Sequence, residues 1–255
     1  MSAIDLNSDL GEWDLDEELP GAIVPDEAEM FRLVTSANVA AGFHAGGAES
    51  MLASARLAFT HDVSLGVHPS YRDRDGLGRR AQEISSALLI REILEQVESL
   101  NVAATVAGTF VRYMKPHGAL YNRIAVDNVQ ADAVARASKE AHLPLLGLAG
   151  TAIHRAADRH GVQFFREAFV DRAYLVDGTL APRSMPGAVI TDPAMAGERA
   201  VEMALEGRVL AIDGSSLTVE LDSLCVHGDT PGAVVMASAA RTMLTDAGLA
   251  IRSFA

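Results

Sequence analysis

Residues 63–71 read Val-Ser-Leu-Gly-Val-His-Pro-Ser-Tyr, a short apolar stretch that runs directly into polar residues. A helical pattern begins after Ser85, with apolar residues three and four positions apart at Leu88, Leu89, Ile93, Leu94 and Val97. This spacing predicts an amphipathic helix, and serine is a favoured residue just before the first turn of a helix. We therefore expect a strand, a polar loop and a helix, in that order.

The same unit recurs along the chain. Further short apolar segments that end in polar residues or glycine lie at 4–7, 38–41, 111–114, 145–148, 163–165 and 224–226. Helical patterns lie between them, at 51–60, 129–141, 151–159, 193–206 and 231–245. Gly161 and Gly248 stand where helices are expected to stop.

Alternating strands and helices are typical of a parallel sheet covered by helices. About seven units in one chain predict an irregular (β/α) barrel of parallel strands, and an open doubly wound sheet is the alternative. Residues 208–221, with the turn sequence Asp213-Gly214-Ser215-Ser216, predict an inserted β-hairpin. No linker or low-complexity tract divides the chain, so we expect residues 1–255 to form a single domain.

The composition is that of a globular protein with a substantial core and an acidic surface. Of its residues 49% are hydrophobic and 22% charged, and its formal charge is −13. Such a surface repels nucleic-acid phosphates and anionic lipids, so neither nucleic acid nor membrane is an expected partner. The single cysteine, Cys225, excludes an intramolecular disulfide. The first residues lack the pattern of a secretory signal, and we expect a cytoplasmic protein.

Polar residues gather where the predicted strands end. In parallel α/β folds the carboxyl ends of the strands and the loops that follow them form the active site. On an extended first strand Asp5, Asn7 and Asp9 point to one side, since side chains alternate. Buried polar groups left without partners cost about 1–3 kcal/mol each, so these three side chains must meet polar neighbours or a ligand. A solvated strand edge is the alternative interpretation.

Two histidine-bearing clusters follow the second and third strands. The second strand begins with Asn38 and is followed by His44 among glycines, which allow close backbone approach to a ligand. The third strand leads into His68, and the loop beyond carries Arg79 and Arg80, side chains suited to bidentate binding of a carboxylate or phosphate. A structural role for His44 and a solvated surface position for the arginines are the alternatives.

The remaining clusters contain both positively and negatively charged side chains. The chain has only two lysines: Lys139 lies in a helical pattern, whereas Lys115 follows the fourth strand, two residues before His117. A lysine at a barrel mouth needs an anionic partner. The later strand ends contribute Glu167, Arg172, His227 and Asp229. Helix capping is the competing role for the residues before Pro231.

Several common catalytic motifs are missing. Neither lysine lies in a G-x-x-x-x-G-K-[ST] loop, and the sequence has no G-x-S-x-G or H-E-x-x-H motif. Asp9, His44, His68, His117 and His227 could in principle assemble around a metal ion. Because they lack local ligand spacing, the sequence gives no firm metal site.

Together the clusters resemble the LamB/YcsF family, which is understood as the A subunit of the prokaryotic 5-oxoprolinase. The matching stretches extend over almost the full length and include the specific sequence Lys-Pro-His-Gly-Ala-Leu-Tyr-Asn at 115–122. Ala41 stands where the family usually has cysteine, and Gly47-Ala48 replaces the usual Asp-Pro. The first difference argues that no thiol is required there.

The resemblance implies a barrel similar to glycoside hydrolase and deacetylase barrels. It also implies ATP-coupled cleavage of 5-oxo-L-proline to L-glutamate in a complex with subunits B and C, and ATP, with or without Mg²⁺, as the cofactor. A metal-dependent carbohydrate deacetylase and a non-catalytic ligand-binding subunit are the two alternatives.

For the lactam reaction we expect a site of four catalytic and eight substrate-binding residues. The catalytic set is Asp9, His44, Lys115 and His117, and no residue is assigned to a metal. Asp9 is the expected general base, Lys115 and His117 stabilise developing negative charge, and Arg79 or Arg172 holds the substrate carboxylate. The substrate-binding set is Asn7, Asn38, His68, Arg79, Glu167, Arg172, His227 and Asp229.

Overall fold

Seven parallel strands close into a barrel in the computed structural model, which describes residues 3–13, 27–228 and 232–255. The barrel strands are β1 (Ala3–Leu10), β2 (Ser36–Ala40), β3 (Ser64–His68), β4 (Val111–Met114), β5 (Leu145–Leu148), β6 (Phe164–Phe169) and β9 (Ser223–Cys225). They pair in this order, and β9 pairs with β1, where Asp5 lies opposite Ser223. The predicted (β/α) barrel is confirmed.

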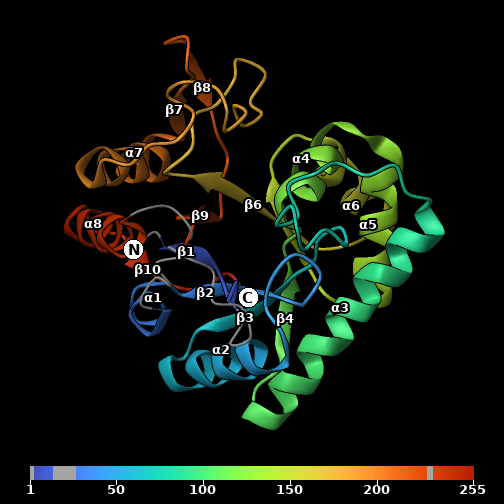
Figure 1. Cartoon of the computed structure of the whole chain (residues 1–255). Helices are drawn as coiled ribbons and strands as arrows, with labels where there is room; N and C mark the ends of the chain where they lie inside the picture. Colours follow the sequence, from blue (N-terminus) through green and yellow to red (C-terminus); the bar gives the residue numbers. More distant parts are fainter. Residues whose placement is uncertain (1–2, 14–26, 229–231) are drawn as a thin grey trace.

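Helices surround the barrel (Figure 1). They are α1 (Glu27–Leu33), α2 (Ala48–His61), α3 (Ser86–Ala107), α4 (Gly118–Val126), α5 (Asn128–Glu140), α6 (Ala152–His160), α7 (Pro193–Glu206) and α8 (Ala233–Asp246). None of the helices in the described part of the chain combines the length and apolarity needed to cross a bilayer.

The helix boundaries follow local signals in the sequence. The Ser85 hydroxyl accepts a bond from the amide of Leu88 at 3.3 Å and caps α3. Helix α6 ends at Gly161, whose φ of 67° lies in the left-handed region, as predicted. Helix α7 spans the predicted residues, with Asp192 as its cap. The predicted hairpin is also present, as β7 (Arg208–Leu210) paired antiparallel with β8 (Ser216–Thr218).

Four elements differ from the sequence-based prediction, and one of them is a short strand at Ala250–Ile251. Helix α1 was not predicted, and neither was α4, which begins only four residues after β4 ends. Strand β6 extends to Phe169 rather than ending at residue 165, because it pairs along its length with β5 and β9. This extension brings Glu167 into the barrel wall.

The two ends of the described chain meet at the amino end of the barrel. A short strand, β10 (Ala250–Ile251), pairs in parallel with the start of β1. Beyond it, the Ser64 hydroxyl at the start of β3 donates to the carbonyl of Ala255 at 2.6 Å. The Phe254 ring packs against Tyr113, with ring centroids 4.9 Å apart. This closure leaves the carboxyl ends of the strands as the open end.

Candidate active site

A network of polar side chains fills the barrel interior, and it starts on β1. The Asn38 side chain of β2 donates to Asn7 and to Asp9, both at 2.8 Å. The Asn7 amide in turn donates to the Ser223 hydroxyl at 2.7 Å, and that hydroxyl donates to Asp5. Asp5, Asn7 and Asp9 therefore share the inward face of β1, as their alternation predicts.

Lys115 is the centre of this network. Its Nζ lies 2.8 Å from Asp9 Oδ1, 2.8 Å from Glu167 Oε1 and 3.2 Å from Asn7 Oδ1. The Glu167 contact is close enough for an ion pair, although Glu167 makes no aligned hydrogen bond within the described residues. Lys115 follows β4 directly, whereas Asp9 and Glu167 lie near the ends of β1 and β6. Three distant segments thus meet at one charged group.

The electrostatics keep the Lys115–Asp9 pair ionised. Burial opposes a charged amine, but Asp9 and Glu167 outweigh it and hold the pKa of Lys115 well above its usual value. Burial likewise raises the pKa of Asp9, yet His68 and Lys115 outweigh it and hold this pKa well below its usual value. At neutral pH the site therefore has a fixed amine cation beside a fixed carboxylate.

Three histidines and Glu12 form a compact cluster next to Asp9. The His44 and His117 rings stack with centroids 3.8 Å apart, and His117 Nδ1 lies 3.0 Å from His68 Nε2. Glu12 Oε1 lies 3.2 Å from His44 Nε2. Burial lowers the pKa of His44, and burial together with His44 lowers that of His117 well below its usual value. Both rings are therefore neutral at pH 7.

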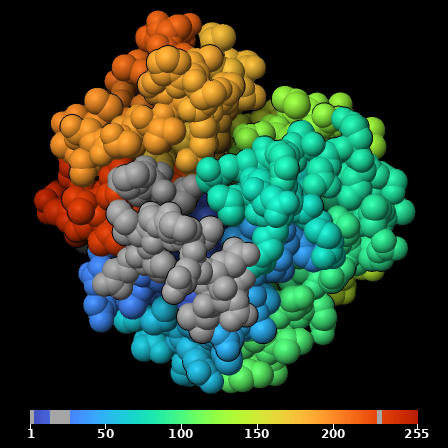
Figure 2. All heavy atoms as spheres, in the orientation of Figure 1, coloured from blue at the N-terminus to red at the C-terminus, as the bar shows by residue number. Residues whose placement is uncertain are grey.

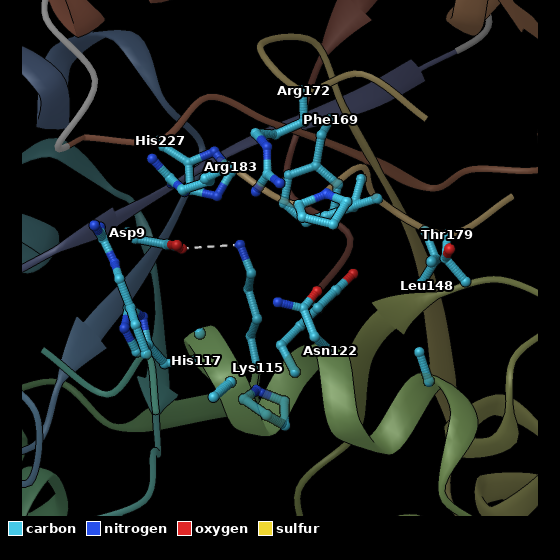
Figure 3. Close-up of a pocket in the computed structure, with 18 of the residues that line it drawn as sticks. Asp9, Lys115, His117, Asn122, Leu148, Phe169, Arg172, Thr179, Arg183 and His227 are labelled. Carbon is cyan, nitrogen blue, oxygen red and sulfur yellow. Dashed lines mark hydrogen bonds and ion pairs between the residues drawn. The ribbon is translucent and has the colours of Figure 1, made fainter. Parts of the chain in front are cut away.

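A cavity of about 490 Å³ opens above these groups at the carboxyl ends of the strands. Figure 3 shows Lys115 extending from the segment between β4 and α4 toward Asp9, with Arg172, Arg183 and His227 on the opposite side of the pocket. In Figure 2 the gold and orange segments that follow β6 and the teal segment that follows β3 form two sides of the same face of the molecule. Among apolar residues, the pocket wall carries four cationic side chains and two carboxylates, namely Arg79, Lys115, Arg172 and Arg183 with Asp9 and Glu12.

His227 is positioned by a carboxylate. Its Nδ1 lies 3.0 Å from Asp171, and its backbone amide donates to the same carboxylate at 3.1 Å. Its ring stacks on Phe169 with centroids 5.3 Å apart. Because β6 extends to Phe169, this ring and Asp171 are brought up to the end of β9, and they fix the His227 imidazole at the pocket wall.

The comparison with known protein families decides the family. The sequence matches the model of the LamB/YcsF family over residues 4–255. The chain belongs to this family.

Relatives of similar length carry one name. The chain is 48% identical over 254 residues to the 5-oxoprolinase A subunit of Paracidovorax citrulli, with 99% of each chain covered. It is 46% identical over 261 residues to the protein of the same name from Kocuria rhizophila, with 100% of each covered. A solved structure, the lactam utilization protein of Thermus thermophilus, superimposes with a TM-score of 0.90 at 42% identity, covering 99% of this chain and 100% of that one.

Most of the predicted site residues lie in one place in this LamB/YcsF barrel. The pocket wall includes seven of them, namely Asp9, His68, Arg79, Lys115, His117, Arg172 and His227. Asn7, Asn38 and Glu167 lie behind this wall and contact its residues, and His44 supports His117 from behind. Asp229 lies outside the described residues. The geometry brings these side chains together and leaves their individual roles as predictions.

Arg172 and Arg80 make contacts within the protein that were not expected of residues that bind a substrate carboxylate or phosphate. The Arg172 guanidinium donates to the backbone carbonyl of Ala181 at 2.6 Å, so it organises the loop after β6 while lining the pocket. Arg80 pairs with Asp73 rather than facing the pocket. Arg79 is therefore the member of the Arg79–Arg80 pair that lines the pocket.

The sequence-based prediction missed Glu12, Asp171 and Arg183 as members of the site. Glu12 and Arg183 line the pocket, and Asp171 positions His227. Glu12 lies three residues beyond Asp9, in a stretch already recognised as a strand end, so its position was a usable signal. Asp171 adjoins the predicted Arg172, but its contact with His227 depends on the length of β6, which only the structure shows.

Proposed function

We propose that this chain is the A subunit of an ATP-dependent 5-oxoprolinase, which opens 5-oxo-L-proline to L-glutamate in a complex with subunits B and C. The full-length relatives at 46–48% identity that carry this name support the proposal. The observation on which it rests most directly is the pocket, whose floor holds Lys115 paired with Asp9 and whose wall holds Arg79, Arg172 and Arg183. Such a site suits a small substrate with a carboxylate.

The chemistry requires two stages. An amide carbonyl in a five-membered lactam is a poor electrophile, so we propose that ATP first phosphorylates the amide oxygen and leaves as ADP. A water molecule then adds to the carbon that bears the phosphorylated oxygen. The ring C–N bond breaks, and the nitrogen takes a proton. A second water molecule hydrolyses the resulting acyl phosphate to glutamate and phosphate.

The residues of the pocket fit the hydrolytic stage. Asp9, kept ionised by Lys115, would accept the proton of the attacking water, although the same pairing weakens its basicity. Lys115 and His117 would stabilise negative charge on the oxygen or phosphate. Arg79 or Arg172 would hold the carboxylate of the substrate. ATP binding is assigned to no residue of this chain, because neither of its lysines lies in a P-loop motif.

Reconstitution tests the proposal. The chain is co-expressed with subunits B and C, and glutamate release from 5-oxoproline is measured with and without ATP. We expect release only when all three proteins and ATP are present. Equal turnover by subunits B and C alone would refute a catalytic role and favour a chain that merely binds ligand.

A metal-dependent deacetylase is the second candidate, because Glu12 and three imidazoles meet beside the pocket. This candidate predicts ATP-independent release of acetate from N-acetylated sugars that stops when a chelator is added. The lactam reaction predicts no such release. The two assays therefore separate the two functions.

A further inference from the structure

Four side chains from four successive strand ends converge beside Asp9. Glu12 follows β1, His44 follows β2, His68 ends β3 and His117 follows β4, and their ligand atoms all lie within 4.8 Å of one another. The three imidazoles are buried, and Glu12 is 22% exposed. Because no two of these residues share a local motif, only the barrel brings them together.

The hydrogen bonds on the far side of each ring decide where its proton lies. His68 Nδ1 lies 2.7 Å from the carbonyl oxygen of Lys115, and His117 Nε2 lies 3.0 Å from that of Leu77. A carbonyl oxygen can only accept, so both of these nitrogens carry the proton. The other nitrogens, His68 Nε2 and His117 Nδ1, face the cluster, and His68 Nε2 also lies 3.3 Å from Asp9 Oδ2.

His44 follows the same logic through a serine. Its Nδ1 lies 2.8 Å from the Ser70 hydroxyl oxygen, and this hydroxyl donates its own proton to the carbonyl of Tyr71 at 2.9 Å. The serine oxygen must therefore accept from His44, which places the proton on Nδ1 and the lone pair on Nε2.

One nitrogen of each imidazole and one oxygen of Glu12 thus lie within 4.8 Å of one another. His117 Nδ1 lies 3.0 Å from His68 Nε2, His44 Nε2 lies 3.2 Å from Glu12 Oε1, and His117 Nδ1 lies 3.5 Å from the same oxygen. Ligands about 2.0–2.1 Å from a tetrahedral zinc ion stand about 3.3 Å apart, close to these three separations. A shared cation would attract all four of these groups.

We propose that Glu12 Oε1, His44 Nε2, His68 Nε2 and His117 Nδ1 bind one divalent transition-metal ion. Nitrogen-rich ligand sets favour Zn²⁺, Co²⁺, Ni²⁺ or Fe²⁺, whereas Mg²⁺ and Ca²⁺ prefer oxygen. The hydrogen bonds to Lys115, Leu77 and Ser70 act as the outer shell that fixes each ring. Because Glu12, His68 and His117 line the pocket, the bound ion faces the substrate cavity next to Asp9.

Metal binding to the full-length chain tests the inference without ATP, lactam or partner subunits. The purified protein is stripped with a chelator and titrated with Zn²⁺, Co²⁺ or Mg²⁺ by calorimetry, and bound metal is counted by mass spectrometry. We expect one Zn²⁺ or Co²⁺ per chain, at least about 100-fold weaker Mg²⁺ binding, and a Co²⁺ absorption spectrum typical of nitrogen and oxygen ligands.

Variants locate the ion. His68→Ala and the nearly isosteric Glu12→Gln should each weaken Zn²⁺ binding by about 10–100-fold or more, whereas His61→Ala, on α2 outside the cluster, should leave it unchanged. Circular dichroism checks that each variant is folded. If His68→Ala does not fold, Glu12→Gln alone provides the test. Absence of stoichiometric Zn²⁺ and Co²⁺ binding, or binding unaffected by both site variants, would overturn the inference. Because metal binding is measured without ATP, lactam or partner subunits, its outcome does not decide the lactam assay, and the two tests can fail separately.

Discussion

At the scale of single residues, Lys115 neutralises two carboxylates inside the barrel. We predict that Lys115→Met lowers the free energy of unfolding by about 3–5 kcal/mol, because Asp9 and Glu167 are left buried without their cation. Chemical denaturation measures the change. Lys139→Met is the matched control: Lys139 is exposed on α5, and its replacement should change stability by no more than about 0.5 kcal/mol.

A second substitution separates charge from packing. If the loss comes from unpaired charge, the double variant Lys115→Met/Glu167→Gln should recover part of the stability. A double variant that is destabilised by the sum of the two single changes would show that the ion pair is not the cause.

Asp5 provides a pH-dependent test below the active site. Burial raises the pKa of Asp5 to about 6, and the hydroxyls of Ser223, Ser36 and Thr35 offset only part of that effect. The folded state therefore binds more protons than the unfolded state between about pH 4 and pH 6, and its stability falls as pH rises through this window. At 1.36 kcal/mol per pKa unit the loss is about 3 kcal/mol.

Asp5→Asn should remove this dependence, because its amide does not ionise. We predict that the free energy of unfolding of the variant, relative to the unmodified protein, rises by up to about 3 kcal/mol from pH 4 to pH 7. Asp177→Asn is the control: the Thr179 hydroxyl lowers the pKa of Asp177, so its effect has the opposite sign and lies at lower pH. A pH-independent difference for Asp5→Asn would contradict the account.

At the scale of elements, close contact between β3 and β4 holds the network in place. The Tyr113 ring lies over Gly66, and its hydroxyl donates to Asn38 Oδ1 at 2.7 Å. A Cβ atom at residue 66 would overlap the ring. Gly66→Ala should therefore cost at least about 2 kcal/mol, through overpacking and the loss of this buried hydrogen bond, as measured by thermal or chemical denaturation.

Gly197 offers a matched comparison on α7. A Cβ atom there meets the sulfur of Met243, the flexible end of a side chain on α8. Gly197→Ala should change stability by no more than about 1 kcal/mol, since the methionine can move and alanine favours the helix. Equal costs for the two substitutions would argue against a specific role for the Tyr113 packing.

The elements also show what could be predicted from the sequence. Every barrel strand was located, because a buried parallel strand is a compact apolar run followed by polar residues. Helix α4 was missed because its residues 118–122 belong to the cluster interpreted as a strand-end loop. Asp9, Lys115 and His227 could be assigned to the site from the sequence because they lie at the ends of predicted strands. Contacts such as Asp171 with His227, or Glu12 with His44 and His117, depend on side-chain directions that no sequence spacing encodes.

At the scale of the whole molecule, the C-terminal residues close one end of the barrel and leave the other for substrate. The Phe254 ring packs on Tyr113 and on Phe165, with centroids 4.9 and 4.4 Å apart. Phe254→Ala should lower the free energy of unfolding by about 1–3 kcal/mol. Phe59→Ala, at a position 62% exposed on α2, should have little effect, and equal losses would contradict this closure.

The central claim is that side chains from distant strands act as one site for lactam opening around the Lys115–Asp9 pair. The most direct measurement is ATP-dependent glutamate release from 5-oxoproline by the reconstituted three-subunit complex carrying Asp9→Asn, with Asp132→Asn, on α5, as control. We predict that Asp9→Asn lowers the turnover by at least about 100-fold while the complex still assembles, and that the control retains full activity. Unchanged turnover in an assembled Asp9→Asn complex would contradict the claim.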